Sequence, residues 1–255
     1  MKNAVVAVPA APVRRKARHR SEMVNQLLFG EEVIVIKEKG SLWVKVKSLH
    51  DGYEGWMTNT LLKETGAKAG VKNNDFIAAD LLNTITIDGR SMHIPFGAFL
   101  PDFADGKGKL AGMEYSFAGN YIKRTNAHPG TKKVEELTSK WLNAPYMWGG
   151  RTVLGVDCSG FVQVNYKMMG IELSRDAWQQ AQQGSTVKKL KEAVCGDLVF
   201  FDDKDEIVHV GILLNSEQII HASGKVRVDT IDKKGIINND TGKRTHYLKS
   251  IKRYW

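Results

Sequence analysis

The sequence predicts an α+β domain over residues 128–255, preceded by one or two small all-β domains over residues 1–65 and 66–127. Three observations carry this prediction. Short β-type runs separated by turn residues fill the first 65 residues. A pattern with helical spacing begins beside Cys158, and apolar runs of strand length follow from Leu198 onward. Helices followed by a run of strands are typical of the α+β class, in which helices pack on an antiparallel sheet.

Composition narrows the class of protein. The chain of 255 residues has 42% hydrophobic and 25% charged residues, as expected of a soluble globular protein with two or three small domains. No apolar run reaches the length of a membrane helix, so we expect no membrane span. The net charge of +9 favours anionic partners. The one basic cluster, at 14–20, comes without a nucleic-acid motif, which argues against nucleic acid.

Residues 1–65 are predicted to form a small all-β domain. Its strands are expected at Ala4–Val8, Glu32–Ile36, Leu42–Lys47 and Gly55–Met57. Turns are expected at Gly40–Ser41 and Asp51–Gly52. The run at 1–12 is short and apolar like a secretory signal, but its prolines and its length favour a first strand. We therefore expect a cytoplasmic protein, or a periplasmic or extracellular one if a signal peptide has been removed.

A second β region is predicted over residues 66–127. The small residues of Thr65–Gly70 form a linker ahead of it. Thr84–Ile87 alternates between polar and apolar residues, and the turn Asp88–Gly89 follows it. Further turns are expected at Asp105–Gly108 and at Gly119–Asn120.

One helix is expected before the Cys158 helix and another after it. Val134, Leu137 and Trp141 lie at helical spacing and predict a helix over 131–142 that Thr131 caps. A short helix is expected over 176–183. The strands from Leu198 to Trp255 are then predicted to form an antiparallel sheet.

Cys158 is a candidate nucleophile because of where its helix begins. Glycine-rich sequence precedes it, and Phe161, Val164 and Met168 recur after it at helical spacing. Asp157 or Ser159 can serve as the N-cap. A cysteine at a helix N-terminus lies near unpaired N–H groups, which stabilise a thiolate over a thiol. Two cysteines make no disulfide framework, so we expect both thiols to be free.

A cysteine nucleophile needs a base and a group that orients the base. Two apolar β-type runs around Asn215–Gln218 predict a hairpin in which His209 falls opposite His221. Cross-strand neighbours have Cβ atoms about 5 Å apart. One histidine can therefore act as the base while the other holds its ring through the second nitrogen.

Five motifs follow one another in a fixed order, namely Tyr146–Gly150, Asp157–Phe161, Gly196–Phe201, His209–Ile212 and Ile220–Ser223. As a set they resemble the NlpC family of papain-like cell-wall cysteine peptidases, over roughly the C-terminal half of the chain. The resemblance implies a papain-like domain in which Cys158 is the nucleophile, His209 the base and His221 the orienting residue. It implies that Tyr146 donates to the oxyanion. Cys195 departs from the family, which often has proline there, but lies in a turn.

The N-terminal half carries a second resemblance. Leu42–Val46 and Tyr53–Met57 resemble parts of a bacterial SH3-like domain, and Ile94–Pro101 resembles part of a second such barrel. Ser21–Gly30 is similar to the matching stretch of peptidases that cut wall-derived peptides from a free amino end. The combination implies hydrolysis of the bond between γ-D-glutamate and the following diamino acid, in peptides whose L-alanine has a free amine.

This substrate suggests roles for six further residues. Asp157, assisted by Ser159, would pair with the ammonium in a partly dry site. Glu22 and Tyr53 would close the amine pocket. Arg175 would bind the free α-carboxylate of the glutamate, and Trp148 would line the groove or pack. We expect no cofactor, no metal and a monomer.

Three alternatives remain open at this level. The chain could be an endopeptidase that cuts intact peptidoglycan, in which the alanine amine is tied up in an amide. It could be a non-catalytic wall-binding protein, which a thiol-reactive peptide would fail to label. It could also be a thiol acyltransferase or amidase, whose products would reveal transfer to an amine.

Overall fold

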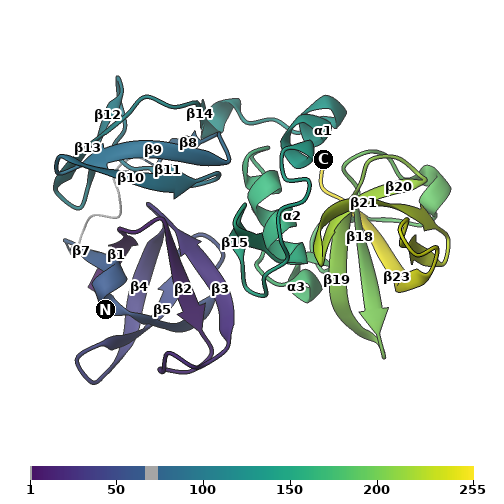
Figure 1. Cartoon of the computed structure of the whole chain (residues 1–255), viewed down its shortest axis with the longest axis horizontal. Helices are drawn as coiled ribbons and strands as arrows, with labels where there is room; N and C mark the ends of the chain where they lie inside the picture. Colours follow the sequence, from purple (N-terminus) through teal and green to yellow (C-terminus); the bar gives the residue numbers. More distant parts are fainter. Residues whose placement is uncertain (1, 67–73) are drawn as a thin grey trace. The chain divides into compact units, whose positions relative to one another are not determined.

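The computed structural model describes residues 2–66 and 74–255 and divides into two compact units (Figure 1). The first unit comprises Met1–Ala127 together with Trp148–Val153, and the second comprises His128–Met147 and Leu154–Trp255. The predicted linker Thr65–Gly70 lies outside the described residues from position 67 onward.

The first seven strands of the first unit form one antiparallel sheet in the order β3-β2-β6-β5-β4-β1-β7. They are β1 (Lys2–Val6), β2 (Ala10–Arg14), β3 (Met23–Leu28), β4 (Glu32–Lys39), β5 (Trp43–Ser48), β6 (Glu54–Thr58) and β7 (Leu62–Thr65). The four predicted strands correspond to β1, β4, β5 and β6. The sequence pattern did not predict β2, because proline at position 12 is atypical of a strand. This strand pairs with β6 only at Arg14, so Pro12 has no partner residue in β6 to which it would need to donate.

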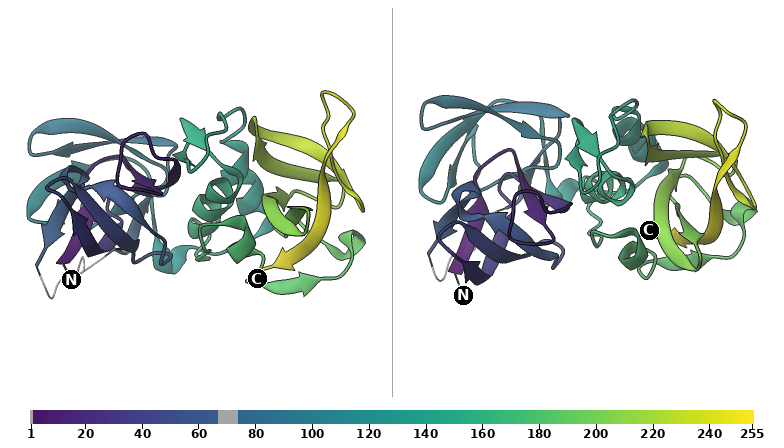
Figure 2. Two further views of the ribbon diagram at one scale, coloured as in Figure 1. Left: turned by 90° about the horizontal axis from the view of Figure 1, so that it is seen from below. Right: turned by 60° about the horizontal axis from the view of Figure 1, so that its bottom comes forward.

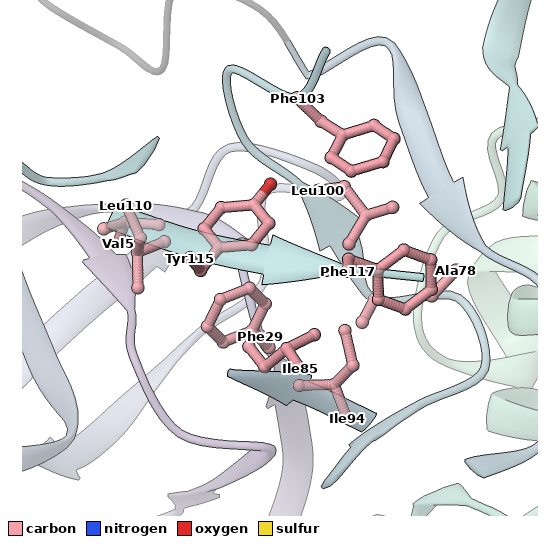
Figure 3. Packing of buried hydrophobic residues seen from close by; sticks show 11 residues of the cluster. Val5, Phe29, Ala78, Ile85, Ile94, Leu100, Phe103, Leu110, Tyr115 and Phe117 are labelled. Carbon is pink, nitrogen blue, oxygen red and sulfur yellow. The ribbon is translucent and has the colours of Figure 1, made fainter. Parts of the chain in front are cut away.

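β1 is buried on both faces. Ala4 and Val6 belong to the core of the first sheet. Val5 points the other way, into a second core that it shares with Phe29, Tyr115 and the β region that follows (Figure 3). The rings of Phe29 and Tyr115 meet edge to face, with centroids 6.1 Å apart. The run of apolar residues at the start of the chain thus reflects a strand that is covered on two sides.

The second β region forms two small sheets, in the orders β10-β9-β13-β12 and β11-β8-β14. Its strands are β8 (Phe76–Ala78), β9 (Leu82–Ile87), β10 (Arg90–Pro95), β11 (Phe99–Leu100), β12 (Lys107–Leu110), β13 (Met113–Phe117) and β14 (Tyr121–Lys123). The predicted turn after β9 is confirmed. Asp88 and Gly89 both have positive φ, at 47° and 73°, as the tight turn of a hairpin requires.

The helices of the second unit are α1 (Thr131–Ser139), α2 (Cys158–Lys167) and α3 (Ala177–Gln180). α1 is shorter than predicted, and its N-cap is Gly130, because Thr131 is already the first helical residue. Short 3₁₀ turns lie at Asn59–Leu61, Arg124–Asn126 and Leu190–Glu192, and two-residue strands at Arg151–Thr152 (β15) and Gly155–Val156 (β16). None of the helices within the described residues has the length and apolar content that a membrane crossing requires.

The second unit is built on an antiparallel sheet in the order β17-β23-β18-β19-β20-β21-β22. Its strands are β17 (Ser185–Val187), β18 (Leu198–Asp203), β19 (Glu206–Leu213), β20 (Gln218–Ser223), β21 (Lys225–Asp232), β22 (Gly235–Ile237) and β23 (Arg244–Arg253). Because β22 also pairs with β23, the strands from β18 to β23 close on themselves, as the yellow-green strands of Figure 2 show. α2 packs against β19 and β20, so the helix that begins at Cys158 faces the predicted histidine hairpin.

Candidate active site

The N-terminus of α2 presents Cys158. Of the two predicted caps, Asp157 is the one that caps the helix, because its Oδ1 accepts a hydrogen bond from the backbone N–H of Gly160 at 2.7 Å. Cys158 is only 5% exposed, and the backbone N–H of Val210 in β19 donates to its sulfur. The cap therefore sets the thiol against β19, one residue along the strand from His209.

The thiol of Cys158 is harder to ionise than the sequence predicts. Burial is the main cause and the carboxylate of Asp157 the second, and they raise the pKa of Cys158 to about 12. The N–H groups of Val210 and Ser159 and the charge of Arg175 lower this pKa but are outweighed. The prediction of a favoured thiolate is wrong because the helix end is dry and shared with a carboxylate. Cys158 is thus a thiol at neutral pH.

His209 and His221 come from adjacent strands, β19 and β20. The register pairs His221 with Gly211, so the prediction that it lies directly opposite His209 is wrong by two residues. A shift of two keeps both side chains on one face of the sheet. Nε2 of His209 and Nδ1 of His221 are 2.8 Å apart, and the two residues are 5% and 1% exposed. The predicted histidine pair is therefore formed diagonally across the two strands.

A third histidine packs on this pair. The ring of His246, from β23, stacks on that of His209 with centroids 4.1 Å apart and planes 25° from parallel. Burial, and then the charges of His221 and His246, hold the pKa of His209 well below its ordinary value. His209 is therefore neutral at working pH, which is the form that a general base requires.

A buried aspartate lies behind His221. Oδ2 of Asp229, in β21, is 3.0 Å from Nε2 of His221, and Asp229 is 1% exposed. Sequence reasoning missed Asp229, its partner Arg227 and His246. A hairpin centred on Gly224 pairs His221 with Arg227 and brings Asp229 within diagonal reach, so the turn signal at Gly224 could have revealed Asp229. No sequence pattern points to His246, which comes from a strand far along the chain.

Asp157, Ser159 and Arg175 form a buried cluster around the start of α2. Nη2 of Arg175 lies 2.6 Å from Oδ2 of Asp157, and its Nη1 donates to Oγ of Ser159 at 2.8 Å. Arg175 is 1% exposed. The sequence predicts that its guanidinium binds a carboxylate of the substrate, whereas the structure turns this guanidinium towards Asp157. Arg175 thus holds the helix cap Asp157 through two hydrogen bonds.

Tyr146 lies close to the same cluster. Its backbone N–H donates to the carbonyl of Gly224 at 2.9 Å, which ties the loop before α2 to the end of β20. Burial, and then the charges of Cys158 and Asp157, raise the pKa of Tyr146 above its ordinary value. Its hydroxyl stays protonated over the working pH range and is available as a hydrogen-bond donor.

Glu22, Tyr53 and Trp148 belong to the first unit. Nε1 of Trp148 donates to Oε1 of Glu22 at 2.9 Å, while Nε of Arg15 pairs with Oε2 of Glu22 at 2.7 Å. Trp148 is 56% exposed, so it does not simply pack. Tyr53 is half-buried, and its backbone N–H donates to Oδ1 of Asp51. The structure brings Glu22 and Trp148 together.

The segment Trp148–Val153 is anchored in the first unit by a buried ion pair that the sequence analysis missed. Arg151 donates through two nitrogens to the carboxylate of Glu31, at 2.8 and 2.9 Å, and both side chains are fully buried. Oε1 of Gln26 also accepts from the backbone N–H of Arg151 at 2.8 Å. Gly149 has a φ of 77°, and a Cβ there would lie 2.9 Å from the carbonyl oxygen of Met23. The loop that leads to Cys158 is therefore fitted closely to β3.

The histidine cluster predicts a loss of stability in mild acid. Burial, and then His221, lower the pKa of His246 to about 4, against an opposing effect of Asp229. Between about pH 6.5 and pH 4 the unfolded chain therefore binds a proton that native His246 does not, so the free energy of unfolding falls as pH falls through this window. We expect a loss on the order of 1–3 kcal/mol.

Urea denaturation at several pH values between 7.5 and 4 would measure this effect. His246→Phe keeps a ring stacked on His209 but removes the titrating group, so the variant should lose less stability than the wild type over the same window. Equal losses in the two proteins would show that His246 is not responsible.

Comparisons with known proteins agree with the motifs. A model described as the NlpC/P60 family matches residues 143–245, and one described as the bacterial dipeptidyl-peptidase Sh3 domain matches residues 13–62. A gamma-D-glutamyl-L-lysine dipeptidyl-peptidase of Bacillus subtilis is 31% identical, over 78% of this chain and 71% of the relative. A protein of the same name from Bacillus cereus is 28% identical, over 89% of this chain and 76% of the relative.

A solved structure is similar over the whole chain. The crystal structure of an NlpC/P60 family protein from Bacillus cereus superimposes with a TM-score of 0.82 at 22% identity, covering 99% of each chain. The likeness shows a shared fold, a papain-like domain with an N-terminal SH3-like all-β region.

Proposed function

The chain belongs to the NlpC/P60 family and is a cysteine-type peptidase, and from this premise we propose its substrate and mechanism. It hydrolyses the bond between γ-D-glutamate and the following diamino acid, in peptidoglycan-derived peptides with a free N-terminal L-alanine. One observation carries the proposal: a buried cysteine at a capped helix end, set against the strand of a histidine that is hydrogen-bonded to a second histidine. The dipeptidyl-peptidase names of two relatives support the choice of bond.

The reaction proceeds through a thioester. Sγ of Cys158 attacks the carbonyl carbon of the γ-glutamyl bond while His209 takes the thiol proton. His209 then gives this proton to the leaving amine of the diamino acid. Water attacks the thioester, His209 accepts its proton, and the thiol reforms. Because burial raises the pKa of Cys158 and lowers that of His209, a neutral pair precedes attack, and proton transfer accompanies it.

The oxyanion that forms at the attacked carbonyl needs hydrogen-bond donors. The backbone N–H of Cys158, at the first turn of α2, is one candidate. The hydroxyl of Tyr146, which stays protonated, is the other.

The ammonium of the substrate is assigned to Asp157. In this proposal Arg175 and Ser159 fix the carboxylate of Asp157 through the hydrogen bonds that they make to each other and to it. Glu22, Tyr53 and Trp148 remain sequence-based assignments for recognition of the amine end. We further propose that residues 1–65 and 66–127 are two SH3-like domains and that residues 128–255 are the peptidase domain.

Mass spectrometry of the products tests the proposed bond and the free-amine requirement. The purified protein is incubated with L-Ala-γ-D-Glu-diaminopimelate and with the same peptide acetylated on alanine. We expect L-Ala-γ-D-Glu and free diaminopimelate from the first peptide and little product from the second. Equal cleavage of both peptides would favour an endopeptidase on intact wall, which has no free alanine amine.

Glu22 provides a test of the N-terminal unit in specificity. Its carboxylate is 40% exposed and already paired with Arg15. Loss of Glu22 should therefore weaken transition-state binding by about 1 kcal/mol, less than the loss of a buried charge would. We therefore expect Glu22→Ala to lower kcat/KM for the free-amine peptide roughly tenfold or less and to leave the acetylated peptide unchanged. Glu54→Ala removes an equally exposed carboxylate, paired with Lys45, as the control. Equal effects of the two substitutions would remove Glu22 from substrate recognition.

A further inference from the structure

Three buried side chains form a continuous line behind the nucleophile. His209, His221 and Asp229 come from the neighbouring strands β19, β20 and β21. Nε2 of His209 lies 2.8 Å from Nδ1 of His221, and Nε2 of His221 lies 3.0 Å from Oδ2 of Asp229. The three residues are 5%, 1% and 1% exposed, so water does not compete for these hydrogen bonds.

The surroundings of Asp229 hold it as a carboxylate in one orientation. Oδ1 accepts from Nη2 of Arg227 at 2.8 Å and from the backbone N–H of Asn239 at 2.9 Å. Burial raises the pKa of Asp229, but the hydrogen bonds from His221, Arg227 and Asn239 outweigh it and hold the pKa below its ordinary value. Arg227 is itself paired with Asp240 at 2.8 Å. Towards His221, the carboxylate of Asp229 can therefore act only as a hydrogen-bond acceptor.

This acceptor determines the proton positions along the whole line. His221 must carry its proton on Nε2 to donate to Asp229, so its Nδ1 in the neutral ring is an acceptor. His209 must then donate from Nε2, which leaves its Nδ1 as the nitrogen with a free lone pair. A base that receives the thiol proton of Cys158 needs this tautomer.

We propose that Asp229 is a positioning residue that fixes the tautomer of His221 and, through it, presents the basic nitrogen of His209 to Cys158. The inference rests on the proposed roles of Cys158 and His209. It adds Asp229 as a fourth residue to the set Cys158, His209 and His221. The ring of His246 on β23 packs against both histidines, and the ring of Phe201 on β18 packs against His209.

Asp229→Asn is the informative substitution because the site would orient the new amide. Oδ1 accepts from two donors, Nη2 of Arg227 and the backbone N–H of Asn239, whereas Oδ2 lies 2.8 Å from Nε of Arg227 and faces His221. The amide oxygen should therefore take the place of Oδ1, which turns the NH₂ group towards His221. His221 would then carry its proton on Nδ1 and donate to His209, so that a neutral His209 would carry its own proton on Nδ1. Nδ1 of His209 would then have no free lone pair with which to accept the thiol proton of Cys158. In a serine protease, the corresponding wrong tautomer lowers kcat by about 10⁴.

The first test reads the tautomer without any substrate. Histidine-selective ¹H–¹⁵N NMR of the wild type should find the His221 proton on Nε2, and in Asp229→Asn it should find that proton on Nδ1. A wild-type His221 protonated on Nδ1 would overturn the proposal, whether or not the variant folds. Because this measurement needs no hydrolysis, it stands apart from any failure of the proposed substrate.

The second test measures the consequence for Cys158. We expect Asp229→Asn to lower kcat by about 10²-fold to 10⁴-fold with KM changed only severalfold, and to slow alkylation of Cys158 by iodoacetamide at neutral pH. The matched control is Asp232→Asn, on the same strand and paired with Arg244 at 2.6 Å but outside the line, which should keep wild-type values. Unchanged kcat and alkylation in a folded Asp229→Asn protein would refute the positioning role.

Discussion

Replacing Cys158 by alanine will abolish peptide hydrolysis and leave the fold intact. The substitution deletes a single buried atom, the sulfur to which the backbone N–H of Val210 donates, one residue along β19 from His209. Removal of the nucleophile from a catalytic group that acts as a unit costs about 10³-fold to 10⁶-fold in kcat. The measurement is the initial rate on L-Ala-γ-D-Glu-diaminopimelate, with circular dichroism as the test of folding.

Cys195 supplies the matched control. It is also a buried free thiol, and burial is the main cause that raises its pKa, to about 11. Its sulfur lies 3.9 Å from the carbonyl oxygen of Thr131, with no histidine beside it among the contacts of the described residues. Cys195→Ala should therefore retain most of the activity. Equal losses from the two substitutions would remove Cys158 from its assigned role.

Replacing Arg151 by methionine will destabilise the first unit by about 3–5 kcal/mol. The substitution leaves the carboxylate of Glu31 fully buried without its guanidinium, although the backbone N–H of Leu28 still donates to it. An uncompensated buried charge is costly because the interior cannot replace the lost hydration. Urea denaturation, followed by the tryptophan fluorescence of the first unit, measures the loss.

An exposed pair in the first unit provides the control. Lys45 and Glu54 are 2.6 Å apart but 34% and 42% exposed, so Lys45→Met should cost less than about 1 kcal/mol. Adding Glu31→Gln to Arg151→Met removes the stranded charge but keeps an acceptor for Leu28, so it should recover part of the stability. A cost for Arg151→Met no larger than that for Lys45→Met would show that the buried pair contributes little.

Local sequence signals predicted the parts of the site that depend on one element at a time. Polar residues followed by apolar residues at helical spacing located the start of α2 and left two candidates for its cap, Asp157 and Ser159, of which Asp157 is the cap in the structure. The two-residue period of a strand placed His209 and His221 on one face, even though the register was wrong by two. A register shift of two residues keeps a side chain on the same face of the sheet, so the predicted histidine pair was correct although the predicted hairpin register was not.

Other features depended on the tertiary structure. The partners of Arg151 and His209, namely Glu31 and His246, lie 120 and 37 residues away, and no local period relates them. The high pKa of Cys158 arises from burial beside Asp157, which a helix pattern does not report. Propensity and periodicity act between near neighbours in the chain, so the sequence alone determined the elements and the face on which each residue lies. Desolvation and pairing of charges depend on what covers that face, so only the tertiary structure decided the ionisation of the nucleophile and the residues that hold its base.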